Sequence, residues 1–152
     1  TKALRHKENR IYIIMLSSEE KKIKFLPLSA REEEIGKIIV NCAYKVHSAL
    51  GPGLLEKIYE ICFCHELKKC GLDLSRQVDI PILHDGLVFD DALRLDVLVE
   101  DLVICELKAV DQVNPVWKAQ ILSHLKLAKK RLGNLINFNT ETIKEGIKRF
   151  VL

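Results

Sequence analysis

The chain has 152 residues, of which 48% are apolar and 30% are charged, and its formal net charge is +3. This length and composition fit one globular domain with its own core and exclude a disordered or fibrous chain. The five cysteines include no CxxC pair, which favours reduced thiols in a cytoplasmic protein over a disulfide framework or a zinc site. We expect no membrane span and no signal peptide, because the apolar run at residues 11–16 is too short.

Charge is distributed unevenly along the chain. Residues 31–114 contain 9 Lys and Arg against 16 Asp and Glu, whereas residues 115–152 contain 8 against 2. An acidic cluster beside a basic flank would suit a metal site next to a track for a polyanion. The solvent-exposed faces of an ordinary domain would account for this uneven charge distribution equally well.

The first predicted elements are two helices that follow an unpatterned N-terminal segment. Residues 1–30 show no sustained hydrophobic period, and we interpret them as an extension to a domain of residues 31–152. Apolar side chains at helical spacing predict a helix over residues 31–50, with Ser29 as its cap. After the sequence GPG, a second helix is predicted over residues 54–70.

The hydrophobic period then changes to one typical of strands. The remaining predicted elements are an edge strand with Pro81 (74–86), two strands joined around Glu100 and Asp101 (92–110), a helix (115–131) and two short strands (132–138 and 146–152). This order predicts a mixed β-sheet with helices on its faces.

Two opposite charges stand in the apolar run VICELKAV. Glu106 and Lys108 lie two residues apart on a predicted strand and therefore project to the same face. Burying a carboxylate or an ammonium costs on the order of several kcal/mol for each group unless another charge compensates the lost hydration. That compensation is either a mutual ion pair or a functional site with a metal ion. The tripeptide ExK occurs four times in the chain, so only its strand context gives it weight here.

Asp96 is a third charged residue in an apolar run, on the preceding strand. A two-residue turn at Glu100 and Asp101 would place Asp96 opposite Cys105, with Glu106 on the other face of the sheet. A three- or five-residue loop, or a bulge, would instead bring Asp96 and Glu106 onto one face, about 5 Å apart between Cβ atoms. Two carboxylates so close together repel each other, which raises the pKa of one of them or recruits a divalent cation. A site with only oxygen ligands favours Mg²⁺ or Mn²⁺ over zinc.

These residues resemble the PD-(D/E)xK nuclease superfamily. Nine residues separate Asp96 from the tripeptide ELK at residues 106–108, and Leu95 stands in place of the proline. The segment GPGLLEKIYE also resembles the signature of the GxxExxY family, which it fits at Gly53, Glu56 and Tyr59. The resemblance covers about residues 34–152. It implies a fold of the α/β (α+β) class, with one restriction-endonuclease-like domain in which helices flank a central mixed sheet.

The resemblance also implies catalytic roles. Asp96 and Glu106 would hold one or two Mg²⁺ (or Mn²⁺) ions, together with the backbone carbonyl of Leu107. Lys108 would orient or help to deprotonate the attacking water and offset charge on the phosphate.

Two further residues would complete this site from the predicted helices. Glu56 would reach the metal from the second helix, although an acid in a first helical turn is also favoured by the helix dipole alone. Gln120, on the third helix, resembles the glutamine that many of these nucleases place beside the lysine. Taken alone it would be an ordinary surface residue.

Contacts with nucleic acid are predicted on the third helix. Relatives tend to carry His where this chain has Trp117 and Tyr where it has His124. His124 could touch a phosphate, and an ordinary histidine on a helix surface is the alternative. Lysines at the end of this helix could contact a nucleic-acid backbone, and cations at a helix C-terminus are the routine alternative. The lysines assigned this role are Lys126, Lys129 and Lys130.

The resulting functional hypothesis is a metal-dependent nuclease. It would hydrolyse phosphodiester bonds in nucleic acid, DNA rather than RNA, with a metal-bound water. The alternative is a nucleic-acid-binding or protein-interaction module that keeps the fold without turnover. We expect a cytoplasmic protein without membrane contacts; a homodimer is one of the oligomeric states left open.

Overall fold

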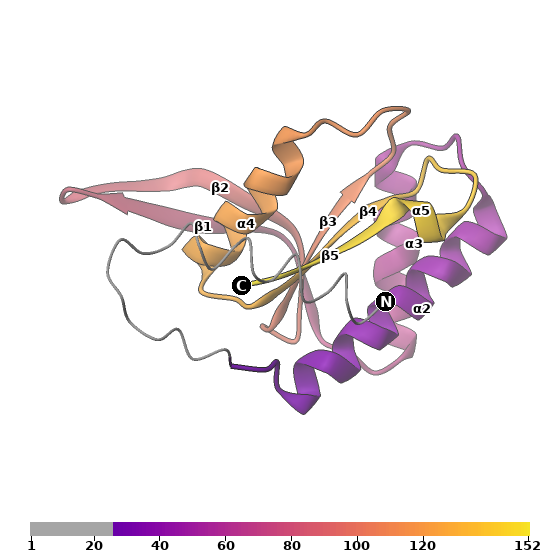
Figure 1. Cartoon of the computed structure of the whole chain (residues 1–152), viewed down its shortest axis with the longest axis horizontal. Coiled ribbons are helices and arrows are strands. Elements are labelled where there is room, and N and C mark those ends of the chain that lie inside the picture. Colours follow the sequence, from indigo (N-terminus) through magenta and orange to yellow (C-terminus); the bar gives the residue numbers. More distant parts are fainter. Residues whose placement is uncertain (1–25) are drawn as a thin grey trace.

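The computed structural model describes residues 26–152 and shows a mixed sheet with helices on both faces (Figure 1). The predicted extension at residues 1–30 therefore lies, except for its last five residues, outside the described residues. The elements in chain order are α2 (Ala30–Leu50), α3 (Glu56–Lys69), β1 (Leu74–His84), β2 (Leu87–Val99), β3 (Val103–Lys108), α4 (Val116–Ala128), β4 (Leu132–Asn137), α5 (Ile143–Gly146) and β5 (Ile147–Val151).

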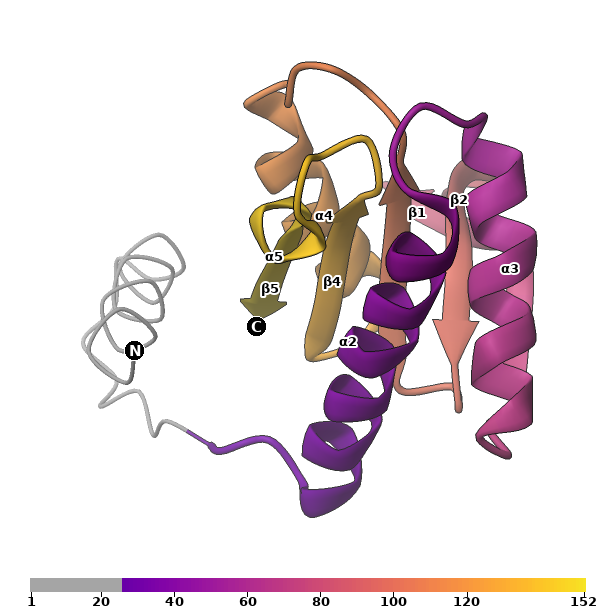
Figure 2. The same cartoon turned by 90° about the vertical axis from the view of Figure 1, so that its right-hand side faces the viewer.

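The five strands form one sheet in the order β1-β2-β3-β4-β5. Neighbouring strands are antiparallel except for β3 and β4, which are parallel and are joined by α4. Figure 2 shows α2 and α3 in front of the sheet and α4 behind it. The fold class expected from the sequence is confirmed.

The helix α2 begins where its sequence can close a capping box. The Ser29 hydroxyl accepts a hydrogen bond from the Glu32 N–H at 3.1 Å, and the Ser29 N–H donates to the Glu32 carboxylate at 2.9 Å. These bonds satisfy amide groups that the first turn leaves without partners. The helix ends at Gly51, whose φ of 67° places it in the left-handed region that glycine adopts without strain.

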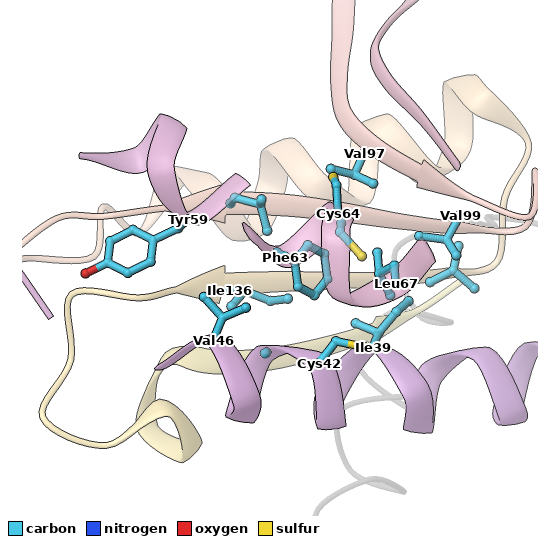
Figure 3. Close-up of a cluster of buried hydrophobic side chains, with 14 of the residues drawn as sticks. Ile39, Cys42, Val46, Tyr59, Phe63, Cys64, Leu67, Val97, Val99 and Ile136 are labelled. Carbon is cyan, nitrogen blue, oxygen red and sulfur yellow. The ribbon is translucent and has the colours of Figure 1, made fainter. Parts of the chain in front are cut away.

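The main core lies between the sheet and the pair α2 and α3 (Figure 3). Tyr59 and Phe63 of α3 are fully buried, and the Tyr59 ring stacks on Phe138 with centroids 4.8 Å apart. Ile39 and Cys42 of α2 complete the layer. This packing holds the N-terminal end of α3, with Glu56, against the sheet.

A second, smaller core fixes α4 on the opposite face. Leu125 packs there with Leu95 and Ile104 of the sheet. Gly133 of β4 lies directly beneath the helix, because a Cβ atom there would come within 3.1 Å of Ile121 and 3.3 Å of Leu125. The missing side chain lets α4 approach the sheet closely at this point.

The hairpin of β1 and β2 extends well beyond the rest of the sheet (Figure 1). β2 pairs with β1 along its whole length but with β3 only at Val97, Leu98 and Val99. The sequence placed the start of this second strand at residue 92, which was too late: β2 begins at Leu87. The first residues of β2 are exposed on both faces of the strand. They therefore lack the alternation of apolar and polar side chains that is typical of a half-buried strand.

No helix within residues 26–152 is long and apolar enough to span a membrane.

Candidate metal and catalytic site

The loop between β2 and β3 has three residues, and this length sets the geometry of the site. Val99 pairs with Val103, which leaves residues 100–102 in the loop. Val97 pairs with Cys105, so the next step of the register places Asp96 opposite Glu106. Of the two arrangements left open by the sequence, the structure has the one in which the two carboxylates share a face.

Asp96 stands where the hydrogen-bonded ladder between β2 and β3 ends. Its Oδ2 accepts a hydrogen bond from the Leu107 N–H at 2.8 Å, in place of a strand carbonyl. The N–H and C=O of one strand residue point to the same neighbour, so the Leu107 carbonyl is also directed toward the Asp96 side. One carboxylate and one carbonyl oxygen therefore converge there.

The electrostatics of this pair favour an added positive charge. Burial and, after it, the negative charge of Glu106 raise the pKa of Asp96 to about 7, although the hydrogen bond from the Leu107 N–H acts in the opposite direction. Glu106 is only 7% exposed. Two carboxylates in so little solvent repel each other, and a divalent cation would relieve the repulsion.

These donors fit Mg²⁺ or Mn²⁺. Carboxylate and carbonyl oxygens are the hard ligands that both ions prefer. No group of three or more His, Cys, Asp and Glu side chains within residues 26–152 is arranged to hold a metal ion. The fit therefore rests on Asp96, Glu106 and the Leu107 carbonyl, and it suits Mg²⁺, which commonly uses one or two carboxylates and keeps several waters.

Lys108 lies two residues beyond Glu106 on the same face of β3. Its ammonium lies over the ring of Trp117 in the first turns of α4, 4.8 Å from the ring centroid. A cation–π contact of this kind holds the ammonium without neutralising its charge. Within the described residues no ion pair between Lys108 and Glu106 is formed, so the interpretation of the two as a mutual salt bridge is not supported.

Comparison with known families agrees with this geometry. The model of the PD-(D/E)XK nuclease superfamily matches residues 33–150, a range that contains every candidate site residue. This chain belongs to the PD-(D/E)XK nuclease superfamily. No curated protein and no solved structure matches it. The finer assignment to the GxxExxY family stays a prediction.

Glu56 occupies the first turn of α3, at the edge of the superfamily site. Partial burial raises its pKa; the positive charge of Lys108 lowers it, and Glu60 and Glu106 raise it. The side chain is exposed and makes no hydrogen bond within the described part of the chain. The charges of Lys108 and Glu106 both act on Glu56, and its role as a metal ligand stays a prediction.

The helix α4 presents three site residues at helical spacing. Trp117, Gln120 and His124 are at positions i, i+3 and i+7 and therefore lie on one face of the helix. Gln120 is exposed and has no hydrogen-bonded partner within residues 26–152. The sequence left His124 as a phosphate contact or an ordinary surface histidine, and in the structure its Nδ1 lies 3.0 Å from Oε1 of Glu106.

The three lysines predicted to bind nucleic acid are not gathered at the site. Lys130 forms an ion pair with Asp101, in the loop that precedes β3, at 3.1 Å. Asp101 precedes Glu106 by five positions, which corresponds to roughly 16 Å of extended chain at 3.3 Å per residue. Lys126 is exposed in the last turn of α4, and Lys129 is its C-cap with a φ of 56°. All three belong to the far end of the sheet from Lys108.

Sequence reasoning missed an irregularity of β1 opposite Asp96. Gln77 lies opposite Asp96, has a φ of 50° and leaves the strand pairing at that step. Its amide donates to Glu60 of α3 at 3.0 Å. Irregular strand positions often occur beside active sites and redirect a side chain. No feature of the sequence distinguishes Gln77. Trp117, in contrast, lies three residues before Gln120 on a predicted helix, and this spacing could have indicated that the two side chains share a face.

Proposed function

We propose that this chain is a metal-dependent nuclease of the GxxExxY family, which hydrolyses phosphodiester bonds in nucleic acid, and DNA in preference to RNA. The observation that carries the proposal is the facing pair of Asp96 and Glu106 with Lys108 on the same face, whose ammonium forms no ion pair within residues 26–152. Superfamily membership supports a nuclease-like function.

Asp96, Glu106 and the Leu107 carbonyl would hold Mg²⁺ or Mn²⁺, and Glu56 would assist from α3. The bound ion would supply Lewis acidity toward the phosphate and lower the pKa of water. Lys108 would offset the charge that develops on the phosphate and orient the attacking water. Trp117 keeps the Lys108 ammonium in place, which leaves it available to a phosphate oxygen.

Cleavage assays on plasmid DNA and on an RNA oligonucleotide test the proposal. We expect cleavage in Mg²⁺ or Mn²⁺, none in EDTA, and a loss of about 10²–10⁴-fold in Asp96→Ala and in Lys108→Ala. Asp91→Ala is the matched control, because Asp91 is an exposed acid on the same strand as Asp96. Equal cleavage by the wild type and both site variants would show that the activity does not arise from this site.

A nucleic-acid-binding or protein-interaction module without turnover is the second candidate. It is favoured by the absence, within residues 26–152, of a third acidic or histidine side chain arranged as a metal ligand with Asp96 and Glu106. Calorimetric titration separates the two candidates. Mn²⁺ binding that is lost in Asp96→Ala supports the nuclease, and DNA binding without either Mn²⁺ binding or cleavage supports the module.

A further inference from the structure

We propose that His124 is a positioning residue for Glu106 and holds its carboxylate in the orientation that binds a divalent cation. The inference rests on the proposed nuclease function. It starts from the contact of 3.0 Å between Nδ1 of His124 and Oε1 of Glu106. Both side chains are largely buried, at 18% and 10% exposure, so the contact is shielded from competing water.

The direction of this hydrogen bond follows from the chemistry of the two groups. A carboxylate that binds a cation is ionised and can only accept, so in that form of the site Nδ1 of His124 carries the proton and donates. The bond engages Oε1 of Glu106, just as the Leu107 N–H engages Oδ2 of Asp96. Each carboxylate is thus held through one oxygen, and its second oxygen is left for a cation.

The position of His124 is itself fixed by packing. Its neighbours Ile121 and Leu125 are buried and lie against Gly133 of β4. Gly133 pairs with Ile104, two residues before Glu106. The close approach of α4 to the sheet therefore occurs next to the carboxylate, and it brings the imidazole within reach of Glu106 without a flexible linker.

A direct contact between His124 and a phosphate is the competing role. The proton on Nδ1 is engaged by Glu106, and in the tautomer that carries its proton only on Nδ1 the other nitrogen, Nε2, is an acceptor. A phosphate oxygen needs a donor, so this tautomer does not suit it. Hydrogen bonds to metal-ligating groups commonly contribute about 10–100-fold to metal affinity, which sets the size of the expected effect.

Mn²⁺ titration calorimetry on three variants tests the inference. His124→Leu removes the donor, His124→Asn keeps an N–H near the place of Nδ1, and His65→Leu removes an exposed histidine on α3 as a control. We expect Mn²⁺ to bind about 10–100-fold more weakly to His124→Leu. We expect an affinity within about threefold of the wild type for His124→Asn and no change for His65→Leu.

Activity and spectroscopy give independent readouts. Saturating Mn²⁺ should restore most of the kcat of His124→Leu, with the KM for DNA unchanged. In the metal-free protein, nitrogen NMR should show the His124 ring protonated at Nδ1, with a different signature in Glu106→Ala. Thermal unfolding identifies a variant that fails to fold, and His124→Asn then provides the comparison with the wild type.

The outcomes separate this inference from the proposed function. If Asp96→Ala loses Mn²⁺ while His124→Leu binds it like the wild type, the positioning role is wrong and the nuclease proposal stands. Unchanged Mn²⁺ affinity with a raised KM for DNA would assign His124 to the phosphate instead. A wild-type protein that binds no Mn²⁺ would overturn both.

Discussion

The pair Asp96 and Glu106 predicts that removing one charge makes the protein more stable while it abolishes activity. The perturbation is Asp96→Asn, which keeps an oxygen that can accept the hydrogen bond from the Leu107 N–H. It removes the charge whose burial and repulsion by Glu106 raise the pKa of Asp96. The wild type carries this unfavourable charge because, under the proposed function, a metal ion compensates it.

The magnitude follows from the pKa of Asp96, which burial and the charge of Glu106 raise from 3.8 to about 7. The folded state binds this proton more tightly than the unfolded state, so the free energy of unfolding falls as pH rises from about 4 to about 7. Roughly three pKa units at 1.36 kcal/mol each give an upper limit of about 4 kcal/mol. Asp96 is only partly buried, and screening by solvent reduces the expected gain of Asp96→Asn to about 1–2 kcal/mol.

Urea unfolding of metal-free protein from pH 4 to pH 8 measures this difference. Near pH 4 the wild-type carboxyl is protonated in the folded state and only about half ionised in the unfolded state, so the stability difference between the two proteins should be smallest there. The advantage of Asp96→Asn should grow up to about pH 7 and then level off. Asp91→Asn, on the exposed part of β2, should show no such growth. A variant that is less stable at pH 8, or a difference that is constant with pH, would refute the reasoning.

Three further predictions rest on single contacts. Gly146→Ala should lower the free energy of unfolding by at least about 2 kcal/mol in urea titration, because the new Cβ would lie 2.0 Å from the Asn137 carbonyl oxygen. Diamide should join Cys42 to Cys70, whose sulfurs are 3.9 Å apart, with a mass loss of about 2 Da and a gain of about 3–4 kcal/mol in urea unfolding. Trp117→Leu should lower kcat at saturating Mn²⁺ about fivefold, from the loss of a cation–π contact worth about 1 kcal/mol.

Each of these predictions has its own control. Gly36→Ala should change stability by less than about 1 kcal/mol, because its Cβ meets only the flexible end of Leu132 at 3.3 Å; an equal loss at both glycines would contradict the steric argument. Cys42→Ser should show no mass loss in diamide, and a cross-link elsewhere would reject the pairing. Tyr44→Leu, on the exposed side of α2, should keep full activity.

The sequence carried enough information for the fold class because the hydrophobic periods are clear. It also narrowed the position of Asp96 to two alternatives but could not choose between them. The choice depended on the loop at Glu100 and Asp101, which both adopt a φ of 52° without being glycine. Non-glycine residues rarely adopt this left-handed conformation. The residues Glu100 and Asp101 therefore match no common turn motif from which a three-residue loop could be predicted.

The contacts of α4 could not be read from the sequence, because they depend on how closely the helix approaches the sheet. Gly133 controls that approach from a different element. Only with the helix in place does His124 reach Glu106 and does Trp117 reach Lys108. The sequence identified these positions as departures from relatives, and the structure gives each of them a partner within the site.

The placement of the basic residues follows from topology, and the sequence could have indicated it. β3 ends at Lys108, at the site, and β4 runs parallel to it. Between two parallel strands the chain must return along the length of the sheet. The helix α4 therefore begins near the site and ends at the opposite end of the sheet. Lysines late in α4, such as Lys130, are therefore distant from the carboxylates. A contact between this helix and a substrate at the site is expected from its first turns, where Lys118 is exposed.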